Sequence, residues 1–272
     1  MPQRIQLGSA SMLAERVGIP VVSDFRTRDT AAGGEGAPLV PLADWWLFRS
    51  DDESRVLLNL GGMANVTWLP RGGELADVIA FDTGPGNAVL DALAAMRSEG
   101  ETHDEGGEAA ARGTPSEVLL AELLEDPFFA LPPPRSTGRE TFGQRYAEKL
   151  RDLCLTLGVV GEDILATAVE LTAASVALGI QRFLVPRGGV DAIYASGGGV
   201  KNRALMAALA RRLGDLTIRP LATLGAAPES KEALAFAFLA HQTLCGLPGN
   251  VPGATGASRP VVLGHVTPGS LR

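Results

Sequence analysis

The sequence predicts an α/β fold in which a mixed five-stranded sheet is flanked by helices. Residues 55–82 contain apolar strands joined by hairpin turns, and from residue 163 onward helical patterns alternate with strands. Strands that come first and then alternate with helices are typical of a mixed sheet covered by helices. The chain has 272 residues, of which 46% are hydrophobic, so it can bury the core of one large domain or of one and a half domains.

Charge and composition exclude several classes of protein. The formal net charge is −7 and no run of five basic residues occurs, which argues against a nucleic-acid partner. Cys154 and Cys245 lie far apart in apolar helical contexts, as expected of reduced cysteines in a cytoplasmic protein. The three histidines lack ligand spacing, so no metal site built by the protein is expected. No uninterrupted apolar run of membrane-spanning length occurs, and the first residues resemble neither a signal nor a transit peptide, so no membrane partner is expected.

The first 50 residues predict a helix at 10–17, a strand at 19–22 and a polar, glycine-rich loop at 24–38. This stretch is too short to hold a core of its own. We therefore expect residues 1–50 to be the C-terminal remnant of a first domain and residues 55–272 to form a second domain.

The hairpin region carries the first candidate site. An apolar strand ends at Gly61-Gly62, a short middle strand is expected near residues 74–76, and another strand at 79–82 ends in Asp82 and a Thr-Gly-Pro-Gly turn. Glycines at strand ends let backbone N–H groups come close to phosphate oxygens. Two alternatives stay open, since the glycines could form a bulge and Asp82 could simply hydrogen-bond its own turn.

Helical signals follow. A helix is expected at 87–98 with Asn87 as its N-cap, a surface loop or short helix at 99–116, a helix at 119–124 and a proline-rich loop at 132–140. The clearest helix covers 163–183, because apolar residues recur there every three or four positions.

A second glycine site lies far downstream. A buried strand at 192–195 leads to a triple glycine, after which Asn202 caps a helix; a strand at 216–219 and a last helix from Pro228 to about residue 244 follow. A triple glycine is a weak signal by itself. Two separated glycine sites nevertheless suggest one nucleotide held at both ends, which favours a phosphotransferase.

The chain resembles the anhydro-N-acetylmuramic acid kinases, members of the superfamily of actin, hexokinase and the heat-shock ATPases. The resemblance is carried by Asp-Phe-Arg at 24–26, Asp-Thr-Gly-Pro-Gly-Asn at 82–87 and Ser-Thr-Gly-Arg-Glu at 136–140, and matching stretches span nearly the whole chain in the family's order. It implies an actin-like ATPase domain of the ribonuclease H-like type, with the remnant of a second such domain.

Some family features differ. Family members begin with a phosphate hairpin of the form Gly-Thr-Ser-x-Asp-Gly-x-Asp, followed by a His-Gly-Gln-Thr stretch, and neither occurs here. We therefore expect the N-terminal part of the first domain to be lacking, which puts stand-alone activity in question. Glu35 stands where the family usually has Gln, and Arg135 stands where it usually has Lys.

The resemblance implies a reaction and its residues. In the family, ATP with Mg²⁺ phosphorylates 1,6-anhydro-N-acetylmuramic acid while water opens the anhydro ring, in bacterial cell-wall recycling, and the residue matching Asp82 is the catalytic base. The implied nucleotide-binding residues are Asn59, Gly61, Gly62, Asn65, Gly84, Gly86, Ser196, Gly197, Gly198, Gly199 and Asn202. The implied substrate-binding residues are Arg26, Asp29, Arg135, Ser136, Arg139 and Glu232.

Other interpretations stay open. Arg26 and Asp29 could form a solvated ion-paired turn, and Glu232 could only compensate a helix dipole. The chain could be a non-catalytic remnant that binds nucleotide or sugar, or a superfamily sugar kinase of another specificity. The expected partners are ATP and a small amino sugar, and a homodimer is also compatible with the sequence.

Overall fold

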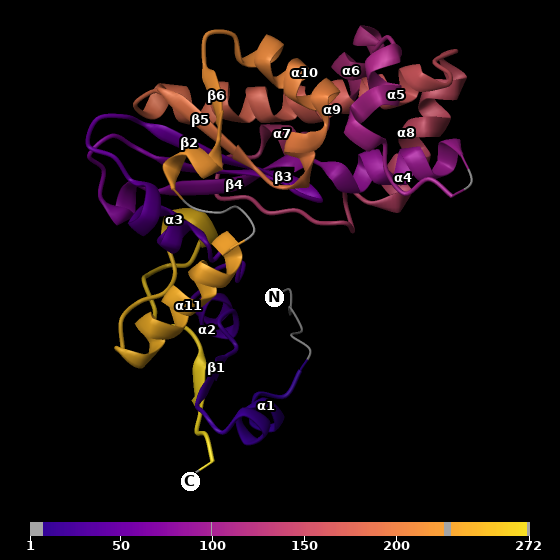
Figure 1. The fold of residues 1–272 in the computed structure, drawn as a ribbon. Coiled ribbons are helices and arrows are strands. Elements are labelled where there is room, and N and C mark those ends of the chain that lie inside the picture. The colour runs from indigo at the N-terminus through magenta and orange to yellow at the C-terminus, as the bar shows by residue number, and fades with distance from the viewer. Residues whose placement is uncertain (1–7, 99, 226–229, 271–272) are drawn as a thin grey trace.

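The computed structural model describes residues 8–98, 100–225 and 230–270, and its centre is one mixed sheet of five strands (Figure 1). The strand order is β4-β3-β2-β5-β6, with β2, β3 and β4 antiparallel and β5 and β6 parallel to β2. The strands are β2 (Arg55–Leu60), β3 (Met63–Leu69), β4 (Ile79–Pro85), β5 (Ala192–Ser196) and β6 (Thr217–Pro220). The predicted α/β class with a mixed five-stranded sheet between helices is confirmed.

Helices cover one face of this sheet and enclose the larger core. They are α4 (Asn87–Arg97), α5 (Glu108–Arg112), α6 (Glu117–Leu123), α7 (Pro127–Ala130), α8 (Gln144–Thr156), α9 (Glu162–Gly179) and α10 (Arg203–Leu213). Side chains that alternate along the strands, such as Leu58, Val66 and Phe81, point into this core. The stretch Glu162–Arg187 is long and apolar enough to cross a membrane, but 89% of its most apolar window is buried inside the molecule, as in a core helix.

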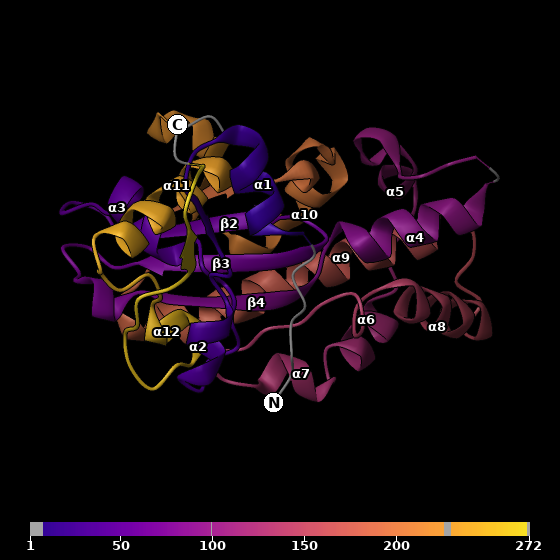
Figure 2. The ribbon, with the colours of Figure 1, turned by 90° about the horizontal axis from the view of Figure 1, so that it is seen from below.

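On the opposite side of the sheet lie segments from both ends of the chain. These are α1 (Ala10–Val17), β1 (Val21–Ser23), α2 (Thr27–Ala31), α3 (Pro41–Phe48), α11 (Lys231–Leu244), α12 (Pro252–Thr255) and β7 (His265–Thr267). Of these segments, α3 and α12 pack directly against the strands. Figure 1 shows α3 beside the sheet and α1 farthest from it, and in Figure 2 α11 and α12 lie over the strands. A second core, with Leu57 and Tyr194 from the sheet, Leu42 from α3 and Leu239 from α11, joins them.

The two ends of the chain also pair with each other directly. Strands β1 and β7 form a two-stranded antiparallel sheet in which Val21 lies opposite Thr267. These contacts cross the expected boundary between residues 1–50 and 55–272, so that division stays a prediction. The remaining turns are 3₁₀ segments at Leu75–Asp77, Glu105–Gly107, Val185–Arg187, Gly198–Lys201 and Leu221–Leu224, and a π-helical turn at Ile180–Leu184.

Two local expectations are wrong. Residues 74–76 do not form a strand, because Glu74 and Asp77 make a reciprocal capping box that closes a 3₁₀ turn, and the middle strand is β3. Asn87 is the first helical residue of α4 and not its cap; its side chain instead donates to the carbonyl of Leu60.

Within the described part of the chain, five helices have no counterpart in the sequence prediction: α2, α3, α7, α8 and α12. The signal for α8 was present, since Ala147, Leu150 and Cys154 recur at helical spacing and are all buried. The expected start of the last helix at Pro228 lies outside the described residues, and α11 is described from Lys231.

Candidate functional site

A row of polar side chains runs across four neighbouring strands of the sheet. In the strand register, Asp82 of β4 lies opposite Asn65 of β3, Asn65 lies opposite Asn59 of β2, and Asn59 lies opposite Ser196 of β5. Residues directly opposite in a ladder present their side chains on the same face, with Cβ atoms about 5 Å apart. The sheet therefore brings together one predicted catalytic residue and three predicted nucleotide-binding residues.

Asp82 is oriented by the proline-rich loop. One oxygen of its carboxylate, Oδ2, accepts a hydrogen bond from the backbone N–H of Thr137 at 2.7 Å and another from the hydroxyl of Ser136 at 3.4 Å. The side chain of Asp82 is only partly buried. The carboxylate is thus fixed by neutral donors in a position that a small ligand can reach.

Arg135, in the same loop, is buried and does not line the cavities described below. Its guanidinium donates to main-chain carbonyls, including that of Asp82 at 2.9 Å. Burial lowers the pKa of Arg135 to about 10, while the nearby charge of Asp82 opposes that shift. The implied substrate contact of Arg135 stays a prediction, and these main-chain contacts were not anticipated from the sequence.

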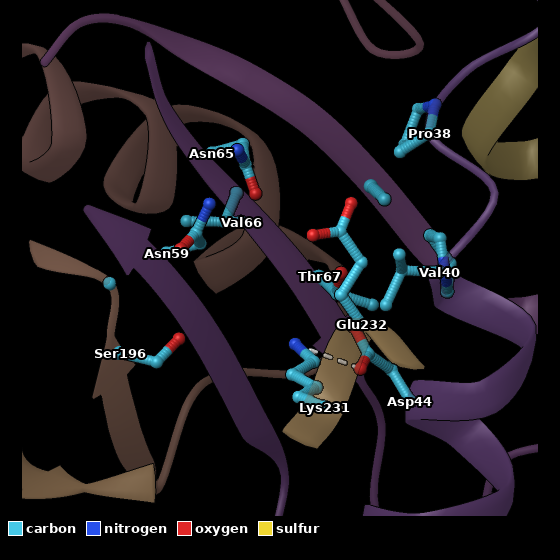
Figure 3. Close-up of a pocket in the computed structure, with 13 residues that line it drawn as sticks. Pro38, Val40, Asp44, Asn59, Asn65, Val66, Thr67, Ser196, Lys231 and Glu232 are labelled. Carbon is cyan, nitrogen blue, oxygen red and sulfur yellow. Dashed lines mark ion pairs between the residues drawn. The ribbon is translucent and has the colours of Figure 1, made fainter. Parts of the chain in front are cut away.

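A polar cavity of about 300 Å³ opens beside this row. Figure 3 shows Asn59, Asn65, Ser196 and Thr67 on its sheet side and the carboxylate of Glu232 directed into it from α11. Its wall consists of Pro38, Val40, Pro41, Asp44, Asn59, Asn65, Val66, Thr67, Ala80, Ser196, Gly197, Lys231 and Glu232. Ala80 is the neighbour of Asp82 on the same face of β4, so Asp82 lies at the margin of this cavity.

A buried ion pair lies in the wall of the polar cavity. The ammonium of Lys231 is 2.9 Å from Oδ1 of Asp44 (Figure 3), and the Asp44 side chain is 2% exposed. Burial raises the pKa of Asp44, and the charge of Lys231 partly opposes that rise. The sequence analysis missed both residues; the only signal was a single aspartate in an otherwise apolar helix.

A second, mainly apolar cavity of about 600 Å³ lies next to the first, and Ser196 and Gly197 line both. Its wall consists of Ala195, Ser196, Gly197, Gly198, Val200, Lys201, Met206, Ile218, Arg219, Pro220 and Leu221. A pocket with apolar walls and a few polar groups suits a planar organic ring.

The predicted glycines divide into two groups. A Cβ on Gly86 would lie 2.5 Å from the carbonyl oxygen of Gly61, and one on Gly197, whose φ is +87°, would lie 2.6 Å from the carbonyl oxygen of Leu60. Packing alone therefore requires these two positions to be glycine. A Cβ on Gly62 or Gly198 would make only ordinary contacts, at 3.8 and 3.5 Å.

Packing also restricts Gly84 and Gly199, two more of the predicted nucleotide-binding glycines, and the main chain of the hairpin turn makes hydrogen bonds of its own. A Cβ on Gly84 would lie 2.8 Å from the ring of Phe129, and one on Gly199 would lie 2.7 Å from Leu60. In the hairpin turn, the carbonyls of Gly61 and Gly62 accept the N–H groups of Asn87 and Ala88. These two bonds attach the start of α4 to the turn. The N–H groups of Asn87 and Ala88 are therefore already used within the protein.

Several predicted site residues lie outside both cavities. Asn202 is the N-cap of α10 and accepts from the N–H of Leu205 at 2.9 Å. Arg26 donates to the carbonyl of Gly36 at 2.6 Å, and Arg139 is exposed on the loop that follows Ser136. Their assignments to nucleotide or substrate stay predictions.

Asp29 is fully buried between the two ends of the chain. Its Oδ1 accepts from the side chains of Asn250 and Thr255, each at 2.7 Å, and its Oδ2 accepts from the N–H of Gly36 at 2.8 Å. These contacts give Asp29 a structural role that the sequence did not reveal, and its assignment to substrate stays a prediction.

No group of three or more His, Cys, Asp or Glu side chains that could hold a metal occurs within the described part of the chain. Mg²⁺ is usually bound by one or two carboxylates together with substrate phosphates and water. The carboxylates beside the cavity, Asp82 and Glu232, fit that pattern better than a cage built by the protein alone.

Comparison with known proteins identifies the family. The family model of anhydro-N-acetylmuramic acid kinases matches residues 1–269. The chain is 48% identical over 263 residues to the anhydro-N-acetylmuramic acid kinase of Salinibacter ruber, covering 97% of this chain and 66% of that protein. It is 44% identical over 264 residues to the corresponding kinase of Caldanaerobacter subterraneus, covering 97% of this chain and 67% of that protein. The chain thus spans about two thirds of the length of these relatives.

Solved structures give a more distant likeness. The activator of the 2-hydroxyisocaproyl-CoA dehydratase from Clostridium difficile, solved with bound ADPNP, has a TM-score of 0.42 and 20% identity to this chain; the match covers 74% of this chain and 67% of that one. This likeness is too distant to bear on function. The family assignment depends instead on the match over residues 1–269 and on the identities above, and by these the chain belongs to the anhydro-N-acetylmuramic acid kinase family.

Proposed function

We propose that this protein is an ATP-dependent kinase that converts 1,6-anhydro-N-acetylmuramic acid to N-acetylmuramic acid 6-phosphate in bacterial cell-wall recycling. Family membership supports the reaction class. The observation that carries the assignment of roles is the polar row across the sheet, which connects Asp82 to two adjoining cavities through Asn65, Asn59 and Ser196. The expected location of such an enzyme is the cytoplasm.

The polar cavity suits the sugar. Its wall offers a hydroxyl from Thr67 and a carboxylate from Glu232, and it ends at Asn59 and Asn65, which stay proposed contacts of the nucleotide. These groups can donate to and accept from the hydroxyls and the acetamido group of an amino sugar. Arg26, Ser136 and Arg139 remain proposed contacts from neighbouring loops.

The apolar cavity suits the adenosine of ATP. Met206, Ile218 and Leu221 provide apolar walls, and the glycine turn that begins at Gly197 separates the two cavities. A nucleotide lying across Ser196 and Gly197 would direct its phosphates toward the polar row. Residues Gly61, Gly62 and Gly198 would then let the backbone approach those phosphates.

Asp82 would act as the general base. It takes a proton from a water molecule whose oxygen attacks the anomeric carbon, and the bond between that carbon and the bridging 6-oxygen breaks. The freed 6-oxygen then takes the γ-phosphoryl group of ATP, and ADP leaves. This transfer needs alignment and neutralisation of charge more than covalent chemistry. Mg²⁺, bound to the nucleotide phosphates with Asp82 or Glu232 nearby, would supply part of that neutralisation.

The direct test incubates the protein with ATP, Mg²⁺ and the anhydro sugar in ¹⁸O-labelled water. Mass spectrometry should find a sugar 6-phosphate with one ¹⁸O at the anomeric carbon. Phosphorylation without ¹⁸O uptake, or of other sugars only, would indicate a superfamily kinase of another specificity. Nucleotide binding by calorimetry without any product would indicate a non-catalytic binding protein.

A further inference from the structure

The buried guanidinium of Arg135 lies at a junction of main-chain segments. Its Nη1 is 3.0 Å from the carbonyl oxygen of Phe128, 3.1 Å from that of Phe129 and 2.7 Å from that of Leu131. Its Nε donates to the carbonyl of Asp82 at 2.9 Å. One side chain thus connects the end of α7 and the following loop to strand β4.

The connection to Asp82 is reciprocal. The N–H of Asp82 donates to the carbonyl of Arg135 at 3.1 Å, while the Arg135 side chain bonds the carbonyl of Asp82. The next two loop residues, Ser136 and Thr137, are the ones that donate to the Asp82 carboxylate. The position of these donors therefore depends on the position of Arg135.

Aromatic rings surround the cation. The guanidinium carbon lies 4.8 Å from the ring centroid of Phe128, 5.2 Å from that of Phe81 and 5.3 Å from that of Phe183. Such rings stabilise a partly desolvated cation. With its pKa lowered only to about 10, Arg135 remains charged at neutral pH. The side chain is therefore held in one place by charge, by hydrogen bonds and by packing.

We propose that Arg135 is a positioning residue for Asp82, and not a substrate ligand: it fixes strand β4 and the 135–137 loop relative to each other, so that the Thr137 N–H and the Ser136 hydroxyl aim the carboxylate. The inference rests on the proposed function in one respect, the role of Asp82 as base. Lysine, which the family usually has at this position, keeps the charge and can still donate to main-chain carbonyls, whereas a neutral side chain loses the charge as well as the planar set of donors.

Three variants and one matched control test the proposal in the whole chain. Arg135→Met keeps the length but removes every donor, Arg135→Gln keeps an amide donor but removes the charge, and Arg135→Lys, with the residue usual in the family, keeps the charge and a donor. Arg55→Lys is the control, because Arg55 also donates to a buried main-chain carbonyl, that of Phe48 at 2.7 Å, and lies over the ring of Tyr194. Arg55 lies at the opposite end of β2 from Asn59.

Activity gives the first measurement. Arg135→Gln should lower kcat by about tenfold to a hundredfold with KM unchanged, the scale expected when a reacting group is misplaced. Arg135→Lys should keep most of the activity, and Arg55→Lys should leave kcat unchanged even if it lowers the melting temperature. A raised KM with unchanged kcat in Arg135→Gln would overturn the proposal and make Arg135 a substrate ligand.

The amide proton of Thr137 gives a measurement that does not need turnover. In ¹H–¹⁵N spectra it should shift with pH as the Asp82 carboxyl titrates, and this shift should disappear in Asp82→Asn. In Arg135→Gln, and in Arg135→Met if it folds, the shift should be much smaller. An unchanged shift in Arg135→Gln would overturn the positioning role. If Asp82→Asn keeps full turnover while Arg135→Gln still alters the Thr137 shift, the proposed base is wrong and the positioning role stands.

Discussion

At the scale of single residues, the carboxylates of Asp82 and Asp29 occupy opposite situations. Asp82 is partly exposed and, within the described residues, its carboxylate accepts from the 136–137 loop, whereas Asp29 is fully buried and accepts from Gly36, Asn250 and Thr255. A partly exposed carboxylate can exchange a proton with a ligand, and a buried one with satisfied oxygens cannot do so without cost. The two residues should therefore respond differently to the same substitution.

Asp82→Asn should leave the fold and the sugar affinity intact, because asparagine is nearly isosteric and can still accept from the Thr137 N–H. It cannot take up a proton, so turnover should fall by roughly two orders of magnitude or more. Steady-state kinetics with ATP and the anhydro sugar measure the change. Asp52→Asn, at an exposed turn, is the control and should be neutral. A nearly normal rate for Asp82→Asn would show that the base lies elsewhere.

Asp29→Asn should act on stability. Both oxygens of Asp29 accept hydrogen bonds, so the NH₂ group of asparagine would face another donor, from Asn250, Thr255 or Gly36. A buried hydrogen-bonding group would then be left unsatisfied. The expected loss in the free energy of unfolding is about 2 kcal/mol. Urea denaturation of Asp29→Asn beside Asp52→Asn measures it. Lost turnover at unchanged stability would instead support the predicted contact of Asp29 with substrate.

Gly198→Val should weaken binding of ATP and ADP strongly while the protein stays folded. A Cβ there would meet only the side-chain amide of Asn87, at 3.5 Å, so added bulk would extend into the space expected for the nucleotide. Calorimetry measures the affinity, and circular dichroism checks the fold. Gly86→Ala is the contrasting variant and should destabilise the protein, because of the 2.5 Å approach to the carbonyl of Gly61. Unchanged nucleotide affinity in Gly198→Val would remove the adenosine assignment.

At the scale of elements, the start of α9 is stabilised by charge. Glu162 is the first residue of this helix, where the helix dipole stabilises its negative charge. Its carboxylate accepts hydrogen bonds from Nε and Nη2 of Arg112 at 2.9 and 2.5 Å. The hydrogen bond from Arg112 lowers the pKa of Glu162 below its ordinary 4.5. The packing of α5 against α9 is thereby linked to the ionisation of a single carboxylate.

This link predicts a pH dependence. Because the pKa of Glu162 is lower in the folded protein than in the unfolded chain, its stabilisation is present above about pH 4.5 and is lost as pH falls through the lowered pKa. Glu162→Gln should therefore lower the melting temperature at pH 7 and have less effect at pH 3. Glu117→Gln, in the first turn of α6 with a side chain 73% exposed, is the control. An equal effect at both pH values would rule out this linkage.

At the scale of the whole molecule, the surface near α1 exposes apolar side chains. Met12 is 59% exposed, Leu13 is 50% exposed and Ile19 is 62% exposed, beside a sheet of only two strands. Contiguous apolar surface next to an open strand edge favours association.

The purified chain should therefore self-associate in a concentration-dependent way, which sedimentation velocity over a range of concentrations can measure. The double variant Met12→Glu with Leu13→Glu should reduce association. Val118→Glu, at an isolated residue of α6 that is 77% exposed, should leave it unchanged. A monodisperse, thermally stable monomer would contradict the expectation.

The sequence by itself determined the parts of this protein that depend on local pattern. Apolar runs located strands β2, β4, β5 and β6, although not β3 or β7. The N-cap Asn202 located the start of α10, and the Asp-Thr-Gly-Pro-Gly and Ser-Thr-Gly-Arg-Glu motifs indicated the family. These signals succeed because strand and helix periodicity, capping and turn chemistry act over a few neighbouring residues.

Only the tertiary structure decided which polar residues meet and what each one does. The register of four strands aligns Asp82 with Ser196, the ends of the chain close around Asp29, and Lys231 pairs with Asp44 in the wall of the polar cavity. The resemblance implied that Arg135 binds substrate, whereas the structure buries it among main-chain carbonyls and aromatic rings. A charged residue has the same appearance in sequence whether it binds a ligand or its own backbone, because the difference lies in burial and partners that only folding brings together.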